Sequence, residues 1–290
     1  MKKLIAILFT LLLVAGCSGK NHLSYLSDGD EVLFTGPGNV SYPKCDLYAQ
    51  LKVTDSSSVL SDIMDRIALA SDRIDMEKIE ADADELINVY KELGYESYIV
   101  SQYGSMEAYR NSYISTLLFS ELSKMYVEEN YETILADDSP VKMQMATFDN
   151  IEDAQKCIED ANNGSTFDMA AANNNSKNTP SSAVYSDSDQ SLVYEVKEYL
   201  NSTDTTGIST IITNVGSTTD ADGNSVETNT YYVLNIESRN PDDFKDEYIE
   251  LKASESETET VRNHFLSKHN IKFYDQDLYE LMSKAYEVLK

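Results

Sequence analysis

The side chains that most often carry chemistry are few in this 290-residue chain. Its histidines and cysteines are His22, His264, His269, Cys17, Cys45 and Cys157. Cys45 and Cys157 form no CxxC pair and have no histidine near them in the sequence, so their spacing does not match a zinc site. The number and spacing of the histidines and cysteines therefore predict no metal centre, and we expect no cofactor.

One polar stretch has the ligand types of a calcium loop, because Asp220, Asp222 and Asn224 lie within GSTTDADGNSVET. An EF-hand loop has glycine at its sixth position and a glutamate at its twelfth. Here the glycine is fourth, and Tyr231 stands at the twelfth position. We therefore interpret Asp222 and Gly223 as the turn of a β-hairpin.

Cys17 ends a pattern typical of bacterial lipoproteins. Two lysines precede an apolar run over residues 4–14, which is too short to span a bilayer and has the form of a secretory signal. The run leads into VAGC, so we expect cleavage before Cys17 and attachment of a diacylglyceryl group to it; an ordinary signal peptide is the alternative. Residues 1–16 would be the signal peptide and residues 17–29 a lipidated tether on the extracytoplasmic face of the cell membrane.

The net charge argues against two classes of partner. It is −27 for the whole chain, and removal of the signal peptide with its two lysines makes it −29 (−27 − 2). A chain this acidic repels nucleic acid and anionic lipid headgroups, so we expect no nucleic-acid partner. Membrane attachment would then depend on the lipid at Cys17.

The first part of the chain has the periodicity of helices. A strand in EVLFTGPGNVS and a short helix entered at Pro43 are expected first. Apolar residues at steps of three and four then predict helices over about 59–70, 75–93 and 105–129, the second ended by Gly94. Residues 30–139 should therefore form a helical module.

The composition changes after Pro140. VKMQMATF is expected to be a strand, Asn150 to cap a helix that Gly164 ends, and a short helix to follow near residues 167–172. A loop rich in Asn and Ser then leads to a helix over 192–200 and to two strands, GISTIITNV and NTYYVLNIES. Cys157 falls beside the apolar residues of its helix, which favours a buried thiol over a disulfide to the other domain.

Residues 239–290 are helical again, with a brief strand in IKFYD before the final helix. Their apolar face needs a partner, and the helical module of residues 30–139 is the candidate. The fold class is α+β, with an α/β domain over residues 140–238 inserted between two helical segments.

Three motifs stand out in this order: CDLYAQLKV, IEDAQKCIEDANNGSTFDMAA and SKHNIKFYDQDL. Together with the lipoprotein signal they resemble the PrsA-type foldase lipoproteins of Gram-positive bacteria and, more distantly, SurA-like periplasmic chaperones. The resemblance covers essentially the whole mature chain. It implies a SurA-like chaperone module, built from the N-terminal and C-terminal segments, with an inserted parvulin-like domain.

The catalytic residues of that family do not carry over to this chain. The resemblance places the two histidines of the parvulin domain at Met145 and Tyr232. The glycine-rich stretch that bears a catalytic Asp or Cys would fall near SSAVYSDSDQ, where neither Asp187 nor Asp189 can be assigned to that role. The family implies a peptidyl-prolyl isomerase, but both expected histidines are absent.

The proline-binding positions are better preserved. The resemblance places an apolar Met and a Phe of the family's pocket at Leu192 and Val196. Both positions are still apolar, although valine offers less surface than a phenyl ring. A substrate-binding surface is therefore expected here even without the catalytic pair.

We expect a membrane-anchored extracytoplasmic chaperone for unfolded or newly secreted polypeptides, with a parvulin-like domain that is catalytically weak or inactive. Twenty tyrosines and no tryptophan would supply adaptable contacts. One alternative is an active prolyl isomerase that uses other residues. A second is a solute-binding lipoprotein, which would need two α/β lobes of repeated strand–helix units, and the sequence does not display these.

Overall fold

The computed structural model describes residues 30–35, 41–45, 47–49, 56–186, 188–219, 223, 225–269 and 271–289. Cys17 and the expected signal peptide and tether lie outside these residues. The chain divides into two compact units, each described by itself below. The helical unit comprises residues up to Leu122 together with Glu257–Lys290, and the sheet unit comprises Ser123–Ser256.

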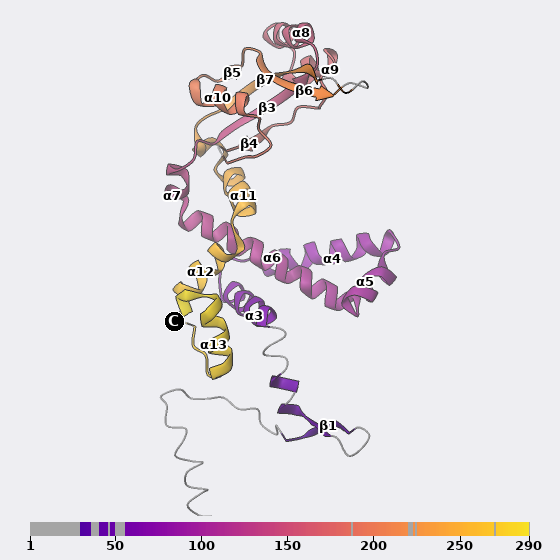
Figure 1. Cartoon of the computed structure of the whole chain (residues 1–290), viewed down its shortest axis with the longest axis vertical. Helices are drawn as coiled ribbons and strands as arrows, with labels where there is room; N and C mark the ends of the chain where they lie inside the picture. The colour runs from indigo at the N-terminus through magenta and orange to yellow at the C-terminus, as the bar shows by residue number, and fades with distance from the viewer. Residues whose placement is uncertain are drawn as a thin grey trace, which may run out of the picture. The chain divides into compact units, whose positions relative to one another are not determined.

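The helical unit is built mainly from helices (Figure 1). Its elements are β1 (Val32–Thr35), β2 (Ser41–Pro43), α3 (Ser56–Leu69), α4 (Met76–Glu92), α5 (Glu96–Tyr103), the first part of α6 (Met106–Glu129), α12 (Thr258–Lys268), α13 (Gln276–Ala285) and the 3-10 turn η3 (Glu287–Leu289). The C-terminal helices α12 and α13 pack against α3. Residues 257–290 thus share one unit with the N-terminal helices.

Helix α4 forms where the sequence predicts it. The side chain of Asp75 accepts a hydrogen bond from the backbone N–H of Lys78 at 3.1 Å and caps the first turn. Apolar residues every fourth position then reach the core, with Ile79 and Ile87 buried. Gly94 ends the helix with a φ of +77°, a left-handed conformation that glycine adopts without steric cost.

Helical residues begin at Lys44, directly after Pro43, as the sequence predicts, although Pro43 itself is the last residue of strand β2. One local prediction in this unit is wrong. Residues 271–275 before α13 form no strand. Their β-branched and aromatic residues suit a strand, but an extended segment needs a neighbouring strand to satisfy its backbone groups, and the described residues place none beside it.

The sheet unit contains an antiparallel sheet with helices on both faces. Its strands are β3 (Val141–Phe148), β4 (Ala183–Tyr185), β5 (Gly207–Ile208), β6 (Ile212–Thr219) and β7 (Ser225–Ser238), and its helices are α7 (Tyr131–Ala136), α8 (Ile151–Asn162), α9 (Phe167–Asn173), α10 (Tyr194–Ser202), η2 (Pro241–Phe244) and α11 (Lys245–Glu255). The strand order is β4-β3-β7-β5, and β6 also pairs with β7. The mixed helix and sheet content agrees with the predicted α+β class.

Alternation along β3 explains why both faces of the sheet are covered. Ala146 and Phe148 point toward α8 and α9, where they pack in one apolar cluster with Val233 of β7. Val141 and Met143 lie in a second cluster with residues of α10. Successive side chains of a strand point to opposite faces, so one strand supplies both cores.

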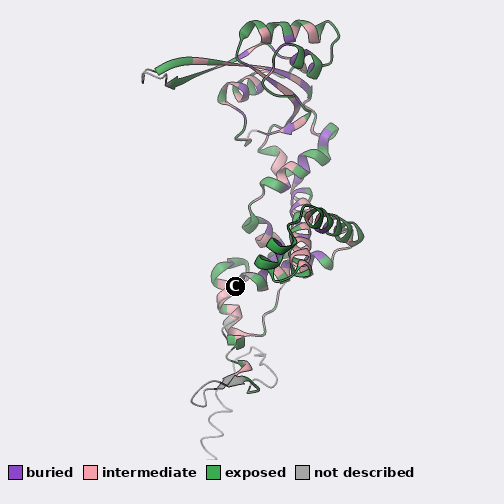
Figure 2. Cartoon of the chain, turned by 90° about the vertical axis from the view of Figure 1, so that its right-hand side faces the viewer, coloured by how far each residue is buried: buried purple, intermediate pink, exposed green. Residues whose placement is uncertain are grey.

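The hairpin of β6 and β7 closes where the sequence predicts it. The last pair of the ladder joins Thr219 to Ser225, and Gly223 between them has a φ of +86°. Asp220, Asp222 and Asn224, whose side chains have the ligand types of a calcium loop, lie outside the described residues. In Figure 2 the two-stranded arm extends away from the helices and is largely exposed.

Helix α11 packs within the sheet unit. A third apolar cluster joins Phe244 and Tyr248 to Val127 at the end of α6, to Tyr131 of α7 and to Val184 of β4. The sheet unit is thus larger at both ends than the expected parvulin-like stretch of residues 140–238. Within the described part of the chain, no helix has both the length and the apolar character needed to cross a bilayer.

Candidate functional site

Met145 and Tyr232 lie on one face of the sheet. The register of β3 and β7 pairs Met145 with Leu234 and Thr147 with Tyr232. Residues two positions apart on a strand point to the same side, so Met145, Leu234 and Tyr232 share a face. Met145 and Tyr232 are diagonal neighbours, which in such a ladder stand about 7–8 Å apart. The two positions that the resemblance assigns to histidines are therefore adjacent.

Helix α10 covers this face. Val196 is fully buried, and Leu192, just before the helix, is 6% exposed; both pack with Leu234 in one apolar cluster. Met145 and Tyr232 pack at the edge of the same cluster and are half-buried. The structure thus brings the four sequence-predicted residues together. Leu192 and Val196 hold α10 on the sheet, whereas Met145 and Tyr232 remain partly exposed at the edge of the cluster.

The described side chains of this cluster offer apolar contacts and the hydroxyl groups of tyrosines. Among the described residues of this cluster, the titratable side chains are Tyr185, Tyr199 and Tyr232. Burial, and then the charge of Asp189, raise the pKa of Tyr185 above its ordinary value. Methionine offers only a weakly accepting thioether. All three histidines of the chain fall outside residues 123–256. Imidazole chemistry from the chain itself is therefore absent from the sheet unit.

The loop between β4 and α10 contains the stretch in which the family's catalytic Asp or Cys would fall. The side chain of Asp189 accepts a hydrogen bond from the backbone N–H of Ser191 at 2.7 Å. The backbone N–H of Asp189 donates to the carbonyl of Ser186 at 3.1 Å. Asp189 thereby folds the loop as a local turn. Asp187 lies outside the described residues.

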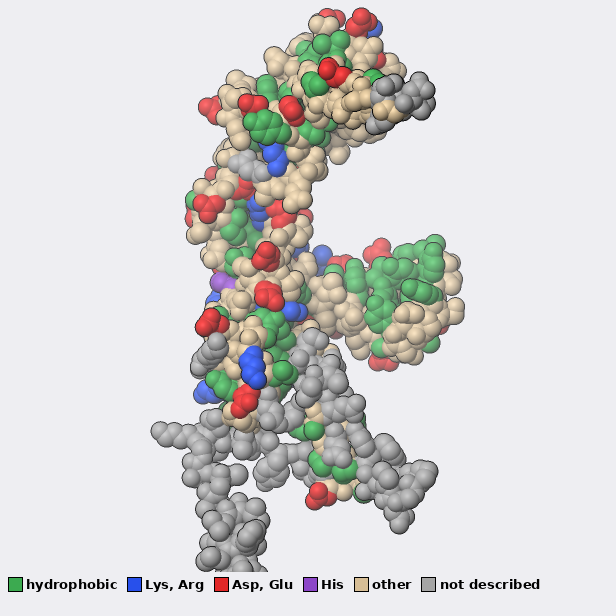
Figure 3. All heavy atoms as spheres, in the orientation of Figure 1, with side chains coloured by type: hydrophobic (Ala, Val, Ile, Leu, Met, Phe, Trp, Pro, Cys, Tyr) green, Lys and Arg blue, Asp and Glu red, His purple; other side chains and the backbone are tan. Residues whose placement is uncertain are grey.

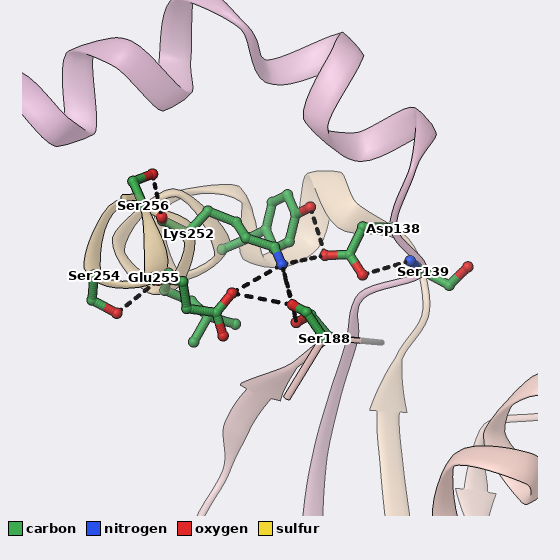
Figure 4. A network of polar contacts seen from close by, with 10 residues as sticks. Asp138, Ser139, Ser188, Lys252, Ser254, Glu255 and Ser256 are labelled. Atoms are coloured by element: carbon green, nitrogen blue, oxygen red, sulfur yellow. Dashed lines mark hydrogen bonds and ion pairs between the residues drawn. The ribbon is translucent and has the colours of Figure 1, made fainter. Parts of the chain in front are cut away.

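A buried ion pair lies beside this loop (Figure 4). The ammonium of Lys252 on α11 is 2.8 Å from a carboxylate oxygen of Asp138, with side-chain exposures of 11% and 6%. Lys252 also contacts the carboxylate of Glu255 at 3.0 Å. The hydroxyl of Tyr248 donates to Asp138 at 3.0 Å. The pair is therefore enclosed by further hydrogen bonds, as a buried charge requires.

The same lysine holds the loop after β4. Its ammonium donates to the hydroxyl oxygens of Ser188 at 2.8 Å and of Ser186 at 3.1 Å. These two hydroxyls are themselves 2.8 Å apart. Lys252 is thus a positioning residue that ties the loop leading to α10 onto α11.

Two pKa values in this network are raised. Burial acts to lower the pKa of Lys252, but its hydrogen bonds with Asp138 and Glu255 outweigh burial and raise it. Burial first, and then the hydrogen bond to Asp138, raise the pKa of Tyr248. Both groups therefore stay protonated in the folded protein at pH values where they would lose a proton in the unfolded chain.

The protein should consequently lose stability in alkali. The ordinary pKa values are 10.5 for Lys252 and 10.0 for Tyr248. Because both are raised by folding, the folded state binds more protons, and stability falls as the pH rises above about 10. The Tyr248→Phe variant should show a smaller loss between pH 9 and pH 11 than the wild type. Urea unfolding followed by circular dichroism measures the difference, with the exposed Tyr194→Phe as the control; equal losses in all three proteins would contradict the expectation.

No described residues form a metal site. No group of three His, Cys, Asp or Glu side chains within the described ranges could hold a metal ion. Cys157 is fully buried, and burial, with a smaller effect of Asp160, raises the pKa of its thiol to about 11. Cys157 is thus a core residue of α8, as its position beside the apolar line predicts.

The sequence gives no sign of the Lys252 network. Asp138 and Lys252 are more than a hundred residues apart, and they are one acid among 50 and one base among 23. The sequence shows that residues 90–113 contain many tyrosines. That these tyrosines cluster in space depends on the turns at Gly94 and Gly104. Long-range pairing of this kind leaves no local pattern.

Comparisons with known proteins give matches at the level of structure. No protein-family model and no curated protein matches the chain. The chain is similar to solved PrsA foldase structures. The foldase protein PrsA from Streptococcus pneumoniae is 18% identical, with a TM-score of 0.48, and the match covers 87% of this chain and 98% of that one. The peptidylprolyl isomerase (PrsA) from Bacillus cereus is 15% identical, with a TM-score of 0.45, and the match covers 90% of this chain and 100% of that one. A third structure, the foldase protein PrsA from Lactococcus lactis, is 13% identical, with a TM-score of 0.45, and the match covers 88% of this chain and 99% of that one.

Proposed function

We propose that this protein is a membrane-anchored extracytoplasmic chaperone that holds unfolded polypeptides. In this proposal the sheet unit contains a parvulin-like domain with little or no prolyl isomerase activity. The observation that carries the proposal is the sheet face on which Met145 and Tyr232 stand side by side, at the edge of a filled apolar cluster.

The chemical argument rests on what catalysis of prolyl isomerisation requires. Rotation about a peptide bond meets a barrier of about 18–20 kcal/mol, and a catalyst must bind the twisted form more tightly than the planar one. Fixed donors and acceptors next to the bond could do this. Met145 has no donor, and Tyr232 supplies one hydroxyl without an imidazole partner. A proline-containing segment could still rest on this surface without being accelerated.

Holding an unfolded chain needs accessible apolar surface and reversible contacts. Several large apolar side chains of the helical unit are well exposed, among them Leu93 at 62% and Tyr98 at 66%. Scattered exposed residues are normal, but a cluster of them favours binding. A light-scattering assay with an unfolded client, run beside a peptide isomerisation assay, tests both halves of the proposal.

The proposed anchor is a lipid on Cys17. The Cys17→Ser variant should be exported but not processed, because the lipid is attached through the thiol and precedes cleavage. Cells expressing each protein would be fractionated, and the mass of the N-terminal peptide measured. The wild type should partition into detergent with a lipid mass, and the variant should keep its signal peptide. A Cys45→Ser variant, which changes an exposed cysteine of the described residues, should behave like the wild type; normal maturation of Cys17→Ser would refute the anchor.

A further inference from the structure

The helical unit carries a cup lined by tyrosines where α4, α5 and α6 meet. Its lining residues are Tyr90, Tyr95, Tyr98, Ile99, Gln102, Tyr103 and Tyr109, around a cavity of about 720 Å³. We call this set the tyrosine cup. In Figure 3 hydrophobic side chains gather over the end of the unit where α4 and α5 meet.

Two glycines make the cup possible. Gly94 between α4 and α5 has a φ of +77°, and Gly104 between α5 and α6 has a φ of +81°. The backbone N–H of Gly104 donates to the carbonyl of Val100 at 2.9 Å and closes α5. Both turns use a left-handed conformation that favours glycine. They bring the tyrosines of three successive helices to one place.

The rings form a continuous row. Their centroids are 6.1 Å apart for Tyr95 and Tyr90, 5.8 Å for Tyr90 and Tyr109, and 4.8 Å for Tyr109 and Tyr103, all in edge-to-face contact. Burial, and then a hydrogen bond with Tyr90, raise the pKa of Tyr109 to about 12, so its hydroxyl stays neutral. The inner part of the cup is thus ordered by the tyrosines themselves.

The outer rings are open to solvent. Tyr98 is 66% exposed, Tyr95 51% and Tyr103 47%. The surrounding helices are acidic, since residues 76–113 contain eight Asp or Glu and three Lys or Arg, a net charge of −5. Two of the three bases are already paired, Lys78 with Asp82 and Arg110 with Asp84. A positively charged partner would therefore be attracted to the tyrosine cup, and a negatively charged one would be repelled.

These features fit one kind of ligand. Rows of aromatic rings receive proline side chains of polyproline II segments, which are already extended and lose little entropy on binding. Lysine and arginine are attracted both to tyrosine faces and to the acidic surroundings. Unfolded chains populate the polyproline II conformation and leave their backbone groups unpaired. The side-chain amide of Gln102 could hydrogen-bond such a backbone.

We propose that the tyrosine cup binds extended, proline-containing segments of polypeptide with flanking lysine or arginine. The inference rests on the proposed function in one respect, since it makes the cup a place where unfolded clients are held. It adds the chemical class of segment and the residues that select it.

The test uses the full mature chain and a dye-labelled peptide with an oligoproline centre flanked by lysines. Fluorescence anisotropy would give the dissociation constant. The Tyr98→Ala/Tyr103→Ala double variant should bind about tenfold more weakly or worse, because it removes two exposed rings of the cup. Tyr98→Phe keeps the ring and should bind nearly as the wild type does. The matched control is Tyr194→Ala, which removes a 71% exposed tyrosine of α10 and should change nothing.

The peptide itself provides two further controls. Replacing its lysines by glutamates, or its prolines by glycines, should each weaken binding, and added salt should weaken binding of the lysine peptide. Equal affinity of the double variant and the wild type for the lysine peptide would overturn the inference. So would equal binding of the glutamate peptide. If the cup instead joins two copies of the chain, sedimentation would show a wild-type dimer that the double variant loses, without peptide binding, and the inference would again be wrong.

Failure of the tyrosine-cup proposal can be distinguished from failure of the chaperone proposal. A wild-type chain that delays client aggregation but does not bind the lysine peptide would refute the cup and leave the chaperone proposal standing. A wild-type chain that binds the peptide but never delays aggregation would refute the chaperone proposal alone. Circular dichroism of each variant would check that the helices are intact.

Discussion

Replacing Lys252 by methionine should lower the free energy of unfolding of this protein by about 3 kcal/mol. Methionine fills much of the space of the lysine stem but removes the charge that faces Asp138, whose side chain is only 6% exposed. A carboxylate left without its partner in such a site bears an uncompensated desolvation cost. The loop after β4 would also lose two hydrogen bonds to Ser186 and Ser188. Urea unfolding followed by circular dichroism gives the change.

The matched control is Lys177→Met. Lys177 and Asp149 also form an ion pair at 2.9 Å in the sheet unit, but their side chains are 53% and 70% exposed. Exposed pairs contribute about 0–1 kcal/mol, so this variant should be close to the wild type. The Asp138→Leu/Lys252→Met double variant should recover part of the loss, because neither charge is then left unpaired. Equal effects of Lys252→Met and Lys177→Met would show that the buried pair does not stabilise the fold.

The parts of the fold that follow local rules could be predicted from the sequence. VKMQMATF is strand β3 with the predicted bounds, because its alternation and its position after Pro140 leave few options. Asn150 caps α8 by accepting from the backbone N–H of Glu152 at 2.8 Å, as expected. In each case the deciding interaction lies within a few residues of the signal.

The parts that depend on long-range pairing could not be predicted. Strand β4 has three residues in a stretch rich in Asn and Ser, and it becomes a strand only because Val184 pairs with Lys142 of β3. The burial of Val196 in the core likewise depends on how α10 lies on the sheet. The sequence therefore predicts four residues that do lie together in the fold, but not that two of them are closed off from solvent.

The second large effect expected is kinetic. The full mature chain should leave cis–trans isomerisation of a short proline peptide essentially at its uncatalysed rate, whereas an active isomerase in the same assay should accelerate it by orders of magnitude. Met145 and Tyr232 provide no pair of groups that could favour the twisted bond. Tyr232→Phe should therefore have no effect on this rate. NMR exchange spectroscopy measures it directly on an unlabelled peptide.

Strong turnover that Tyr232→Phe abolishes would mean that the phenol takes part in an active site built from other residues. Turnover that both proteins share would place the activity elsewhere in the chain. Either result would favour the alternative in which this protein is an active prolyl isomerase.

The central claim is that this protein holds unfolded chains without isomerising their prolines, and a single refolding experiment tests both parts. The client is a protein whose slow refolding phase is limited by a proline isomerisation and which partly aggregates while it refolds. Refolding is followed with increasing amounts of the mature chain, and both the soluble yield and the rate constant of the slow phase are measured. The account predicts a higher yield with no acceleration of the slow phase. A slow phase that accelerates at substoichiometric amounts of the chain, or a yield that never rises, would contradict it.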